Sequence, residues 1–226
     1  MSQSTALSFL LFFALASGVV GSLRGPGTVV KVFKKEETPF YFNVNASESQ
    51  NMSKVIFTGE RTYISYRSYL NDPLFGNDGK CPYLIPKYPE GPAATSFQLV
   101  LGYKTTSGEE VNMTRLAELI KYQGYQAPNI LSIKKSPTSR VEDRRYTLIF
   151  SDYSNCSVVR SSYMNGGCEI WAPTSTVGQE PTPCCLFLYE ILCGRMKYKM
   201  YDADFCSIPI PTEAPELVEL VIQKDK

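Results

Sequence analysis

The chain has 226 residues, with 23 lysines and arginines, 22 aspartates and glutamates, no histidine and a net charge of +1 at pH 7. A nearly neutral chain lacks the cationic surface that binds nucleic acid or an anionic membrane, so neither partner is expected. The lack of histidine excludes Ser-His-Asp and Cys-His catalysis and histidine-based zinc sites. We therefore expect a binding protein with no catalytic residue, metal or cofactor; only a carboxylate-pair hydrolase stays open.

The first 21 residues carry no charged side chain, contain an apolar stretch at 10–16 and end in small residues. This pattern predicts a secretory signal peptide over 1–21, because the apolar run is too short for a membrane span. Secretion agrees with four N-glycosylation sequons, although the last has a cysteine in its middle that we expect to be bonded. The sequons begin at Asn45, Asn51, Asn112 and Asn155.

The next residues, 22–50, are interpreted as an N-terminal extension with short β-like runs at 27–33 and 39–45, followed by a helical turn within 51–59. Short β-rich runs separated by turn residues come next, which predicts an all-β barrel or sandwich. One segment, 116–123, has helical spacing instead and is read as a loop helix. The β-rich runs are 62–69, 82–86, 96–105, 109–114, 129–135, 145–150, 156–163 and 167–172.

A helix is predicted over 183–193, with Thr182 as N-cap, Pro183 at the first helical position and Gly194 as the stop. Its residues are nearly all apolar, so it must pack against another element. A last strand or extended arm follows at 197–205. The residues after Cys206, 207–226, are expected to form a loosely ordered tail.

Seven cysteines in a secreted chain predict a disulfide framework, and no Cys-x-x-Cys spacing supports a zinc ribbon or a thioredoxin-like site. Asn165-Gly166 predicts a two-residue hairpin turn that pairs Tyr163 with Cys168. That register places Cys156 too far along the strand to bond Cys168. Both then need partners on the predicted helix, where neighbouring side chains point about 100° apart. One of the adjacent cysteines at 184 and 185 is therefore the odd thiol.

Four separated motifs resemble one known family. Tyr-x-x-Cys-x-Val-Val at 153–159, Cys-Glu-Ile-Trp at 168–171, and Cys-Cys at 184–185 before Tyr-Glu-x-x-Cys-Gly are similar to the tick salivary lipocalins, the histamine-binding-protein family. Residues 62–81 and 150–156 resemble the same family. The resemblance covers about 52–206 and implies a lipocalin domain at 51–206.

The resemblance implies an eight-stranded antiparallel barrel with a C-terminal α-helix packed outside. It also implies the disulfides Cys81–Cys206, Cys156–Cys185 and Cys168–Cys193. Cys184 is left free, either buried and inert or bridging two chains. Proteins of this family are secreted in saliva and capture small host mediators, either biogenic amines such as histamine and serotonin or lipids, and some bind host proteins instead.

Glu169 and Trp171 lie two residues apart on a predicted strand and share a face. If Cys168 points to the helix, both point into the cavity. There a carboxylate can pair with an ammonium, and an indole can add a cation–π contact. The alternative is that Trp171 fills the core and Glu169 pairs with a buried arginine such as Arg67.

Tyr63 and Tyr66 match pocket positions of the family, as does Tyr69, although a spacing of three keeps them on one face only with a bulge. In the run 145–150, Tyr146, Leu148 and Phe150 share a face and either line the cavity or pack under the helix.

Two departures from the family pattern argue against a two-histamine pocket. Asn51-Met52-Ser53-Lys54 stands where the family begins Asp-Ala-Trp-Lys, and Ser157 stands where amine binders often have aspartate. One amine site around Glu169 is slightly favoured. A leukotriene, fatty acid or sterol is the second candidate. A protein-binding complement or immune modulator that uses outer loops and residues 22–50 is the third.

Overall fold

The computed structural model describes residues 42–87, 96–134 and 143–207. The predicted signal peptide, residues 22–41 of the predicted extension and residues 208–226 of the predicted tail lie outside the described residues. Among the described residues, no helix is long and apolar enough to cross a membrane.

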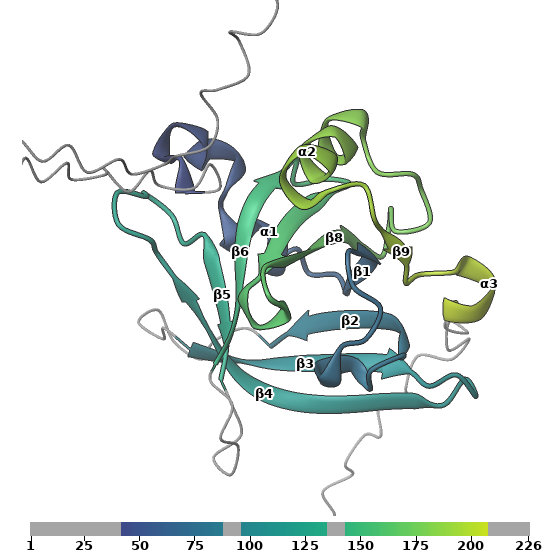
Figure 1. Cartoon of the computed structure of the whole chain (residues 1–226). Coiled ribbons are helices and arrows are strands. Elements are labelled where there is room, and N and C mark those ends of the chain that lie inside the picture. Colours follow the sequence, from purple (N-terminus) through teal and green to yellow (C-terminus); the bar gives the residue numbers. More distant parts are fainter. Residues whose placement is uncertain (1–41, 88–95, 135–142, 208–226) are drawn as a thin grey trace, which may run out of the picture. The chain divides into compact units, whose positions relative to one another are not determined.

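The strands of the described residues form one antiparallel sheet that closes into a barrel (Figure 1). Consecutive strands pair from β2 to β8, and β1 then pairs with both β8 and β2. A short ninth strand, β9, pairs with β1 outside this ring. The strands are β1 (Thr62–Arg67), β2 (Lys80–Pro86), β3 (Ser96–Lys104), β4 (Glu110–Ile120), β5 (Ile130–Ile133), β6 (Arg144–Ser151), β7 (Ser157–Ser161), β8 (Gly167–Pro173) and β9 (Tyr198–Lys199).

Helix α2 (Pro183–Cys193) follows the last barrel strand and packs outside on β6, β7 and β8. The predicted barrel with an external helix is therefore confirmed, and the helix has its predicted bounds. A short helix, α1 (Met52–Ile56), confirms the helical turn expected within 51–59, and Asn51 caps it by accepting a hydrogen bond from the Ser53 amide at 3.0 Å. Helix α3 (Ala203–Cys206) ends the described chain.

Two expectations from local pattern are wrong. Residues 116–120 are the end of strand β4, because Ala117 pairs with Phe97 on β3 and with Ile133 on β5. Pairing on both sides outweighs the helical spacing of the segment. The β-like run at 39–45 ends instead in a 3₁₀-helix, η2 (Val44–Ser49), while the run at 27–33 lies outside the described residues.

The hairpin between β7 and β8 differs from the predicted two-residue turn. Ser161 pairs with Gly167 and Arg160 with Cys168, and residues 162–166 form the loop. The loop begins with a 3₁₀ turn, η4 (Ser162–Met164), after which Asn165 and Gly166 adopt φ of 54° and 75°. The Asn-Gly pair thus takes the left-handed conformation that it favours, but at the end of a longer loop. Cys156 and Cys168 still do not bond each other.

The buried apolar residues form separate clusters inside and outside the barrel. The interior cluster contains residues from every strand from β1 to β8, and α1 closes the barrel at one end. A second cluster lies between α2 and β6–β8. A third lies outside, around Tyr63, Tyr83 and Cys81.

Three disulfides join these layers, and they are the pairs that the family resemblance implied. Cys156–Cys185 and Cys168–Cys193 attach α2 to β7 and β8, with Cα separations of 6.3 and 5.8 Å. Cys81–Cys206 attaches α3 to the start of β2, with a Cα separation of 5.5 Å. Cys184 is free and exposed, so the expectation that it is buried is wrong.

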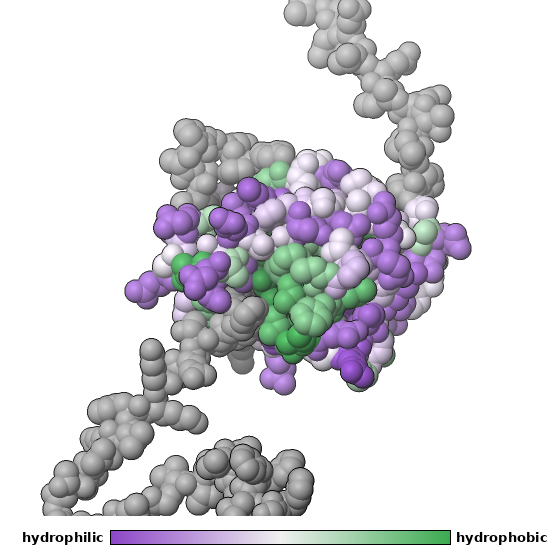
Figure 2. All heavy atoms as spheres, turned by 90° about the horizontal axis from the view of Figure 1, so that it is seen from above, coloured by the Kyte–Doolittle hydropathy of each residue, from purple (hydrophilic) through white to green (hydrophobic). Residues whose placement is uncertain are grey.

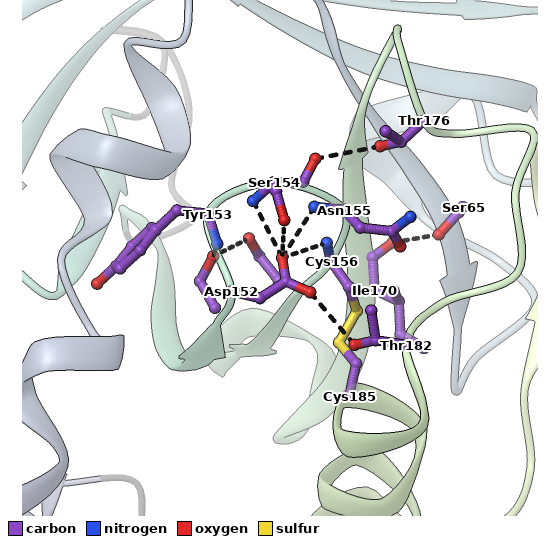
Figure 3. The surroundings of a disulfide bond; sticks show 12 residues. Ser65, Asp152, Tyr153, Ser154, Asn155, Cys156, Ile170, Thr176, Thr182 and Cys185 are labelled. Atoms are coloured by element: carbon purple, nitrogen blue, oxygen red, sulfur yellow. Dashed lines mark hydrogen bonds between the residues drawn. A yellow bond between two sulfur atoms is a disulfide. The ribbon is translucent and has the colours of Figure 1, made fainter.

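Asp152 joins the β6–β7 loop to the start of α2 (Figure 3). Its Oδ1 accepts the backbone N–H groups of Ser154, Asn155 and Cys156 at 2.8–3.0 Å, and its Oδ2 accepts the Thr182 hydroxyl at 3.2 Å. Thr182 precedes the helix as predicted, but its side chain makes no capping hydrogen bond to α2. The hydroxyl instead fastens the helix to the loop, beside the Cys156–Cys185 disulfide.

Replacing Asp152 with alanine is expected to lower the free energy of unfolding by about 1–2 kcal/mol, because three loop amides lose their acceptor. Burial acts to raise the pKa of Asp152, but the hydrogen bonds from Asn155, Cys156 and Ser154 outweigh it and hold the pKa below 3.8. The contribution is therefore present above pH 3.8 and is lost as the pH falls further.

Urea unfolding at pH 7 and at pH 3 measures this effect. Asp152→Asn is the matched control, since it keeps the Oδ1 acceptor and should lose less. Equal losses in both variants would contradict the assigned role of Oδ1.

Candidate functional site

Glu169 and Trp171 both point into the barrel and are fully buried. Trp171 belongs to the interior cluster, whereas Cys168 and Ile170 lie on the other face of β8 under α2. The alternation along β8 thus places an acid and an indole side by side inside the barrel, as the spacing of Glu169 and Trp171 predicted.

Two neutral donors bind the carboxylate of Glu169. The Tyr69 hydroxyl donates to Oε1, and the indole Nε1 of Trp171 donates to Oε2. Gly167 makes room for Tyr69, because a Cβ at this position would lie 2.6 Å from the Tyr69 ring. The first residue of β8 is therefore part of what positions the site.

A second acid, Asp72, lies in the segment after β1. Its Oδ2 accepts the Tyr163 hydroxyl at 2.9 Å, and the hydroxyls of Tyr163 and Tyr146 lie 2.6 Å apart. The Tyr146 ring meets the Trp171 ring edge-on at a centroid distance of 5.1 Å, which links the two acids through aromatic contacts. We call these residues the polar cluster: Arg67, Tyr69, Asp72, Tyr146, Tyr163, Glu169 and Trp171.

Arg67 is fully buried and does not form an ion pair with Glu169, although the two residues are opposite each other on β1 and β8. Its Nη2 donates to the carbonyls of Leu70 and Asn77, and its Nη1 lies 3.9 Å from Asp72 Oδ2. Within the described part of the chain, Glu169 has no cationic group within 4.0 Å. The predicted alternative of a Glu169–Arg67 pair is therefore replaced by an Arg67–Asp72 pair.

Burial, and then the negative charge of Asp72, raise the pKa of Glu169 to about 7, against the opposing effects of the Tyr69 and Trp171 hydrogen bonds and of the more distant positive charge of Arg67. Burial also raises the pKa of Asp72 above its ordinary value. Both acids therefore hold protons more readily than exposed carboxylates do. A cation in direct contact with Glu169 would oppose the shift of its pKa.

Side chains fill the barrel interior. A pocket of about 20 Å³ borders Trp171 between α1 and β8, which is room for about one water. Helix α1 fills one end of the barrel with Met52, Val55 and Ile56. Residues 68–79 follow the opposite end of β1 and bury Leu74 and Phe75 in the same cluster. We call residues 68–79 the lid segment. Because buried side chains occupy both ends of the barrel, a ligand must displace some of them to enter.

The three tyrosines of the first strand do not share a face. Tyr63 lies in the outer cluster with Tyr83, and Tyr66 packs under α2. A bulge between Ile64 and Tyr66 keeps both outside, after which Tyr69 turns inward to Glu169. Tyr63 and Tyr66 are thus not brought together with Glu169 and Trp171, and neither enters the site proposed below.

A second bulge changes the expected face of β6. Tyr146 and Leu148 point into the barrel, but the register shifts between Leu148 and Phe150, and Phe150 packs toward α2. The expectation that all three share a face is wrong for Phe150. One extra residue in a strand moves every later side chain to the opposite face.

Asp72 and Tyr163 were not identified from the sequence. Asp72-Pro73 has the sequence of a 3₁₀-helix start, and Asp72 does cap η3 (Pro73–Phe75) through the Leu74 amide. Nothing in that local signal shows that the second carboxylate oxygen reaches Tyr163 in the loop between β7 and β8.

The four predicted sequons differ in surroundings. Asn45 and Asn112 are exposed, although the Asn112 amide oxygen contacts the Tyr83 hydroxyl. Asn51 is half-buried and caps α1. Asn155 is half-buried, and its amide donates to Gln179 at 3.3 Å. Glycosylation at each stays a prediction.

A closed antiparallel barrel with an external helix and an inward-facing polar cluster defines a lipocalin-type barrel protein. The sequence pattern of the tick histamine-binding protein family matches residues 43–207, and the chain belongs to that family.

Three solved structures are similar to this chain at low identity. AM182 in complex with serotonin is 17% identical, with 73% of this chain and 91% of that chain covered and a TM-score of 0.48. Japanin from Rhipicephalus appendiculatus bound to cholesterol is 13% identical, with coverage of 64% and 93% and a TM-score of 0.43. Insecticyanin from the tobacco hornworm Manduca sexta is 14% identical, with coverage of 70% and 86% and a TM-score of 0.49. No curated protein matches the chain.

The buried Glu169 should make stability depend on pH. Its pKa is about 7 when folded against 4.5 in its ordinary state, so between these values the folded protein holds a proton that the unfolded chain has lost. The free energy of unfolding should therefore fall as the pH rises from 4.5 through 7, by roughly 2–3 kcal/mol from this group.

Denaturant unfolding of wild type and Glu169→Gln across pH 4.5–8 tests this, because the glutamine does not titrate. Asp72 contributes with the same sign in both proteins. Parallel profiles for the two proteins would contradict the assigned pKa.

Proposed function

We propose that the protein is a secreted salivary lipocalin that captures a small biogenic amine in its barrel, with Glu169 and Trp171 as the main contacts. The observation that carries this proposal is a fully buried carboxylate that has two neutral donors and no cation within 4.0 Å among the described residues. Burying a carboxylate without a counter-charge is costly. An ammonium group is the ligand that removes this cost.

The rings around the acid favour an aromatic amine such as serotonin or histamine. Trp171, Tyr146 and Tyr69 are all at or beside Glu169, and a desolvated cation over such a ring gains about 0.5–2 kcal/mol. Tyr163 and Asp72 extend the polar cluster toward the lid segment. The chemistry is stoichiometric capture, without turnover of the ligand.

Binding requires the barrel to open, since its interior is filled. The lid segment is in direct contact with the proposed site. It contains Tyr69, which binds Glu169, and it contains the second acid, Asp72. Its buried residues are Asp72, Leu74, Phe75 and Gly79, and the other residues of the segment are partly or fully exposed. Outward movement of this segment would free the space beside Glu169 while the strands stay paired.

In vivo, capture of an amine would lower the free concentration of a host inflammatory mediator at the feeding site. Membership of the family and the predicted secretion support this proposed role. Capture depends on affinity and on the amount of protein delivered.

A lipid mediator is the second candidate, favoured by Arg67. Its Nε and Nη1 are buried without a hydrogen-bond partner, and so is Nε of Arg144. The carboxylate of a fatty-acid-derived lipid would satisfy these donors. The interior lining of leucine, isoleucine and phenylalanine would suit its chain. A host protein partner is the third candidate.

Titration with serotonin or histamine is expected to change the fluorescence of Trp171, the only tryptophan of the chain, in a saturable way. Glu169→Gln should weaken binding at least tenfold, because it removes the charge that pairs with the ammonium. Glu190→Gln is the matched control, since Glu190 is exposed on α2.

Saturation by a fatty acid or eicosanoid, with no response to either amine, would overturn the amine proposal and favour the lipid. No response to any of these ligands in folded protein would favour a protein partner.

The affinity for serotonin should rise with pH up to about 7 and level off above it. Below this value Glu169 is protonated, and a bound cation must displace that proton at a cost of about 1.4 kcal/mol per pH unit. An alkylammonium group stays charged over this range. Dissociation constants measured from pH 5.5 to 8 should therefore change by up to about tenfold per unit on the acidic side. A flat profile would exclude Glu169 as the counter-ion.

A further inference from the structure

Helix α2 is apolar on both of its long faces. Cys185 and Tyr189 are buried against the barrel. On the opposite side, Cys184, Phe187, Leu188 and Ile191 follow the i, i+3, i+4, i+7 spacing of one helix face. Glu190, at the edge between the two faces, is the only charged residue of the helix. We call the side formed by Cys184, Phe187, Leu188 and Ile191 the outer face of α2.

The outer face is unusually exposed for its chemistry. Phe187 is 62% exposed, Ile191 61% and the neighbouring Met196 64%, and these are the three most exposed large apolar side chains of the described residues. Figure 2, the view from above, shows apolar side chains gathered into one patch on this side of the molecule, ringed by polar residues. A helix that is apolar all round is normally buried, so this face is expected to be covered.

The free thiol lies on the same face. Six of the seven cysteines are paired, and Cys184 is the exposed seventh. It stands one helical turn from Phe187. An odd, exposed cysteine in a disulfide-bonded chain indicates bonding to a second molecule.

We propose that the outer face of α2 docks on the same face of a second copy of this chain, with a disulfide between the two Cys184 residues. This inference does not depend on the ligand of the barrel. The site that captures the ligand faces the barrel interior, on the other side of β8.

The occupant is a second copy for two reasons. A two-fold axis brings one surface patch onto itself, so the axis can pass beside Cys184 and set the two thiols opposite each other. The four residues of the outer face carry no charge, so the patch does not repel its own copy. Phe187 of each chain would then pack across the axis.

Helix α2 is also suited to carry an intermolecular disulfide, because two internal disulfides attach it to the barrel. The thiol is therefore presented on a rigid element. Once joined, the two faces meet at a high effective concentration, so an interface smaller than the usual ~800 Å² per partner is sufficient.

The covalent step needs an oxidant, which we take to be a small-molecule disulfide such as oxidised glutathione. The Cys184 thiolate of one chain attacks the disulfide, forms a mixed disulfide and releases one thiol. The Cys184 thiolate of the second chain attacks the protein sulfur of that mixed disulfide and releases the second thiol. Two protein thiols are oxidised to one disulfide, and one small disulfide is reduced to two thiols.

The test uses the full chain produced in an oxidising secretory host. Its mass is measured by non-reducing and reducing gels and by light scattering, and free thiols are counted by alkylation. Wild type is expected to run at twice the chain mass without reductant, at the chain mass with it, and to carry no alkylatable thiol.

Three variants locate the contact. Cys184→Ser should abolish the covalent dimer. The double variant Phe187→Lys with Ile191→Lys keeps the thiol but charges the outer face, and it should lower the dimer yield at least tenfold. Leu116→Lys is the matched control, because Leu116 is 51% exposed on β4, and its yield should equal that of wild type. Circular dichroism and an intact count of three internal disulfides verify folding in each case.

The other outcomes overturn the proposal. A monomer with one alkylatable thiol per chain would show that no copy docks there, and a Cys184 adduct of any other mass would identify a different occupant. A covalent dimer in Cys184→Ser would assign the bond to another cysteine. Wild-type dimer yield in the doubly charged variant would reduce the contact to random thiol oxidation.

Discussion

Strand β8 carries the acid and the indole that point into the barrel. The Cys168–Cys193 disulfide to the external helix fixes which face of β8 points outward. Side chains along a strand alternate between its two faces. Because Cys168 points outward to α2, Glu169 and Trp171 on the opposite face point into the barrel. Sliding β8 by one residue would turn Cys168 into the barrel and Glu169 toward α2. The Cys168–Cys193 disulfide that attaches α2 therefore also orients Glu169 toward the barrel interior.

A carboxylate placed inside a barrel then constrains everything around it. Tyr69 and Trp171 donate to it, and Gly167 yields space for the tyrosine. Asp72 is the second acid of the same enclosure, and its negative charge, together with burial, raises the pKa of Glu169. A site of this kind is poorly neutralised when empty. In the proposed function, the charge that destabilises the free protein becomes favourable in a complex with a cation.

The outer side of β8 has a different role. There Cys168 and Ile170 pack with Cys185 and Tyr189, so the inner side of α2 completes a small core of its own. The opposite side of α2 is also apolar, because Phe187 and Ile191 are exposed there. One strand therefore separates two surfaces: the proposed ligand site within the barrel and the exposed outer face of α2, on which we propose that a second chain docks.

Local sequence determined the features that depend on neighbouring residues alone. Alternation placed Glu169 with Trp171, the Thr182-Pro183 start and Gly194 stop bounded α2, and the β-rich runs predicted an all-β barrel or sandwich. Tertiary structure decided the rest. The bulges at Ile64–Tyr66 and Leu148–Phe150, the β4 strand at 116–120, and the meeting of Asp72 with Tyr163 all arise from pairing between distant segments. Strand register and cross-barrel contacts are set by partners far along the chain, and a local pattern carries no information about them.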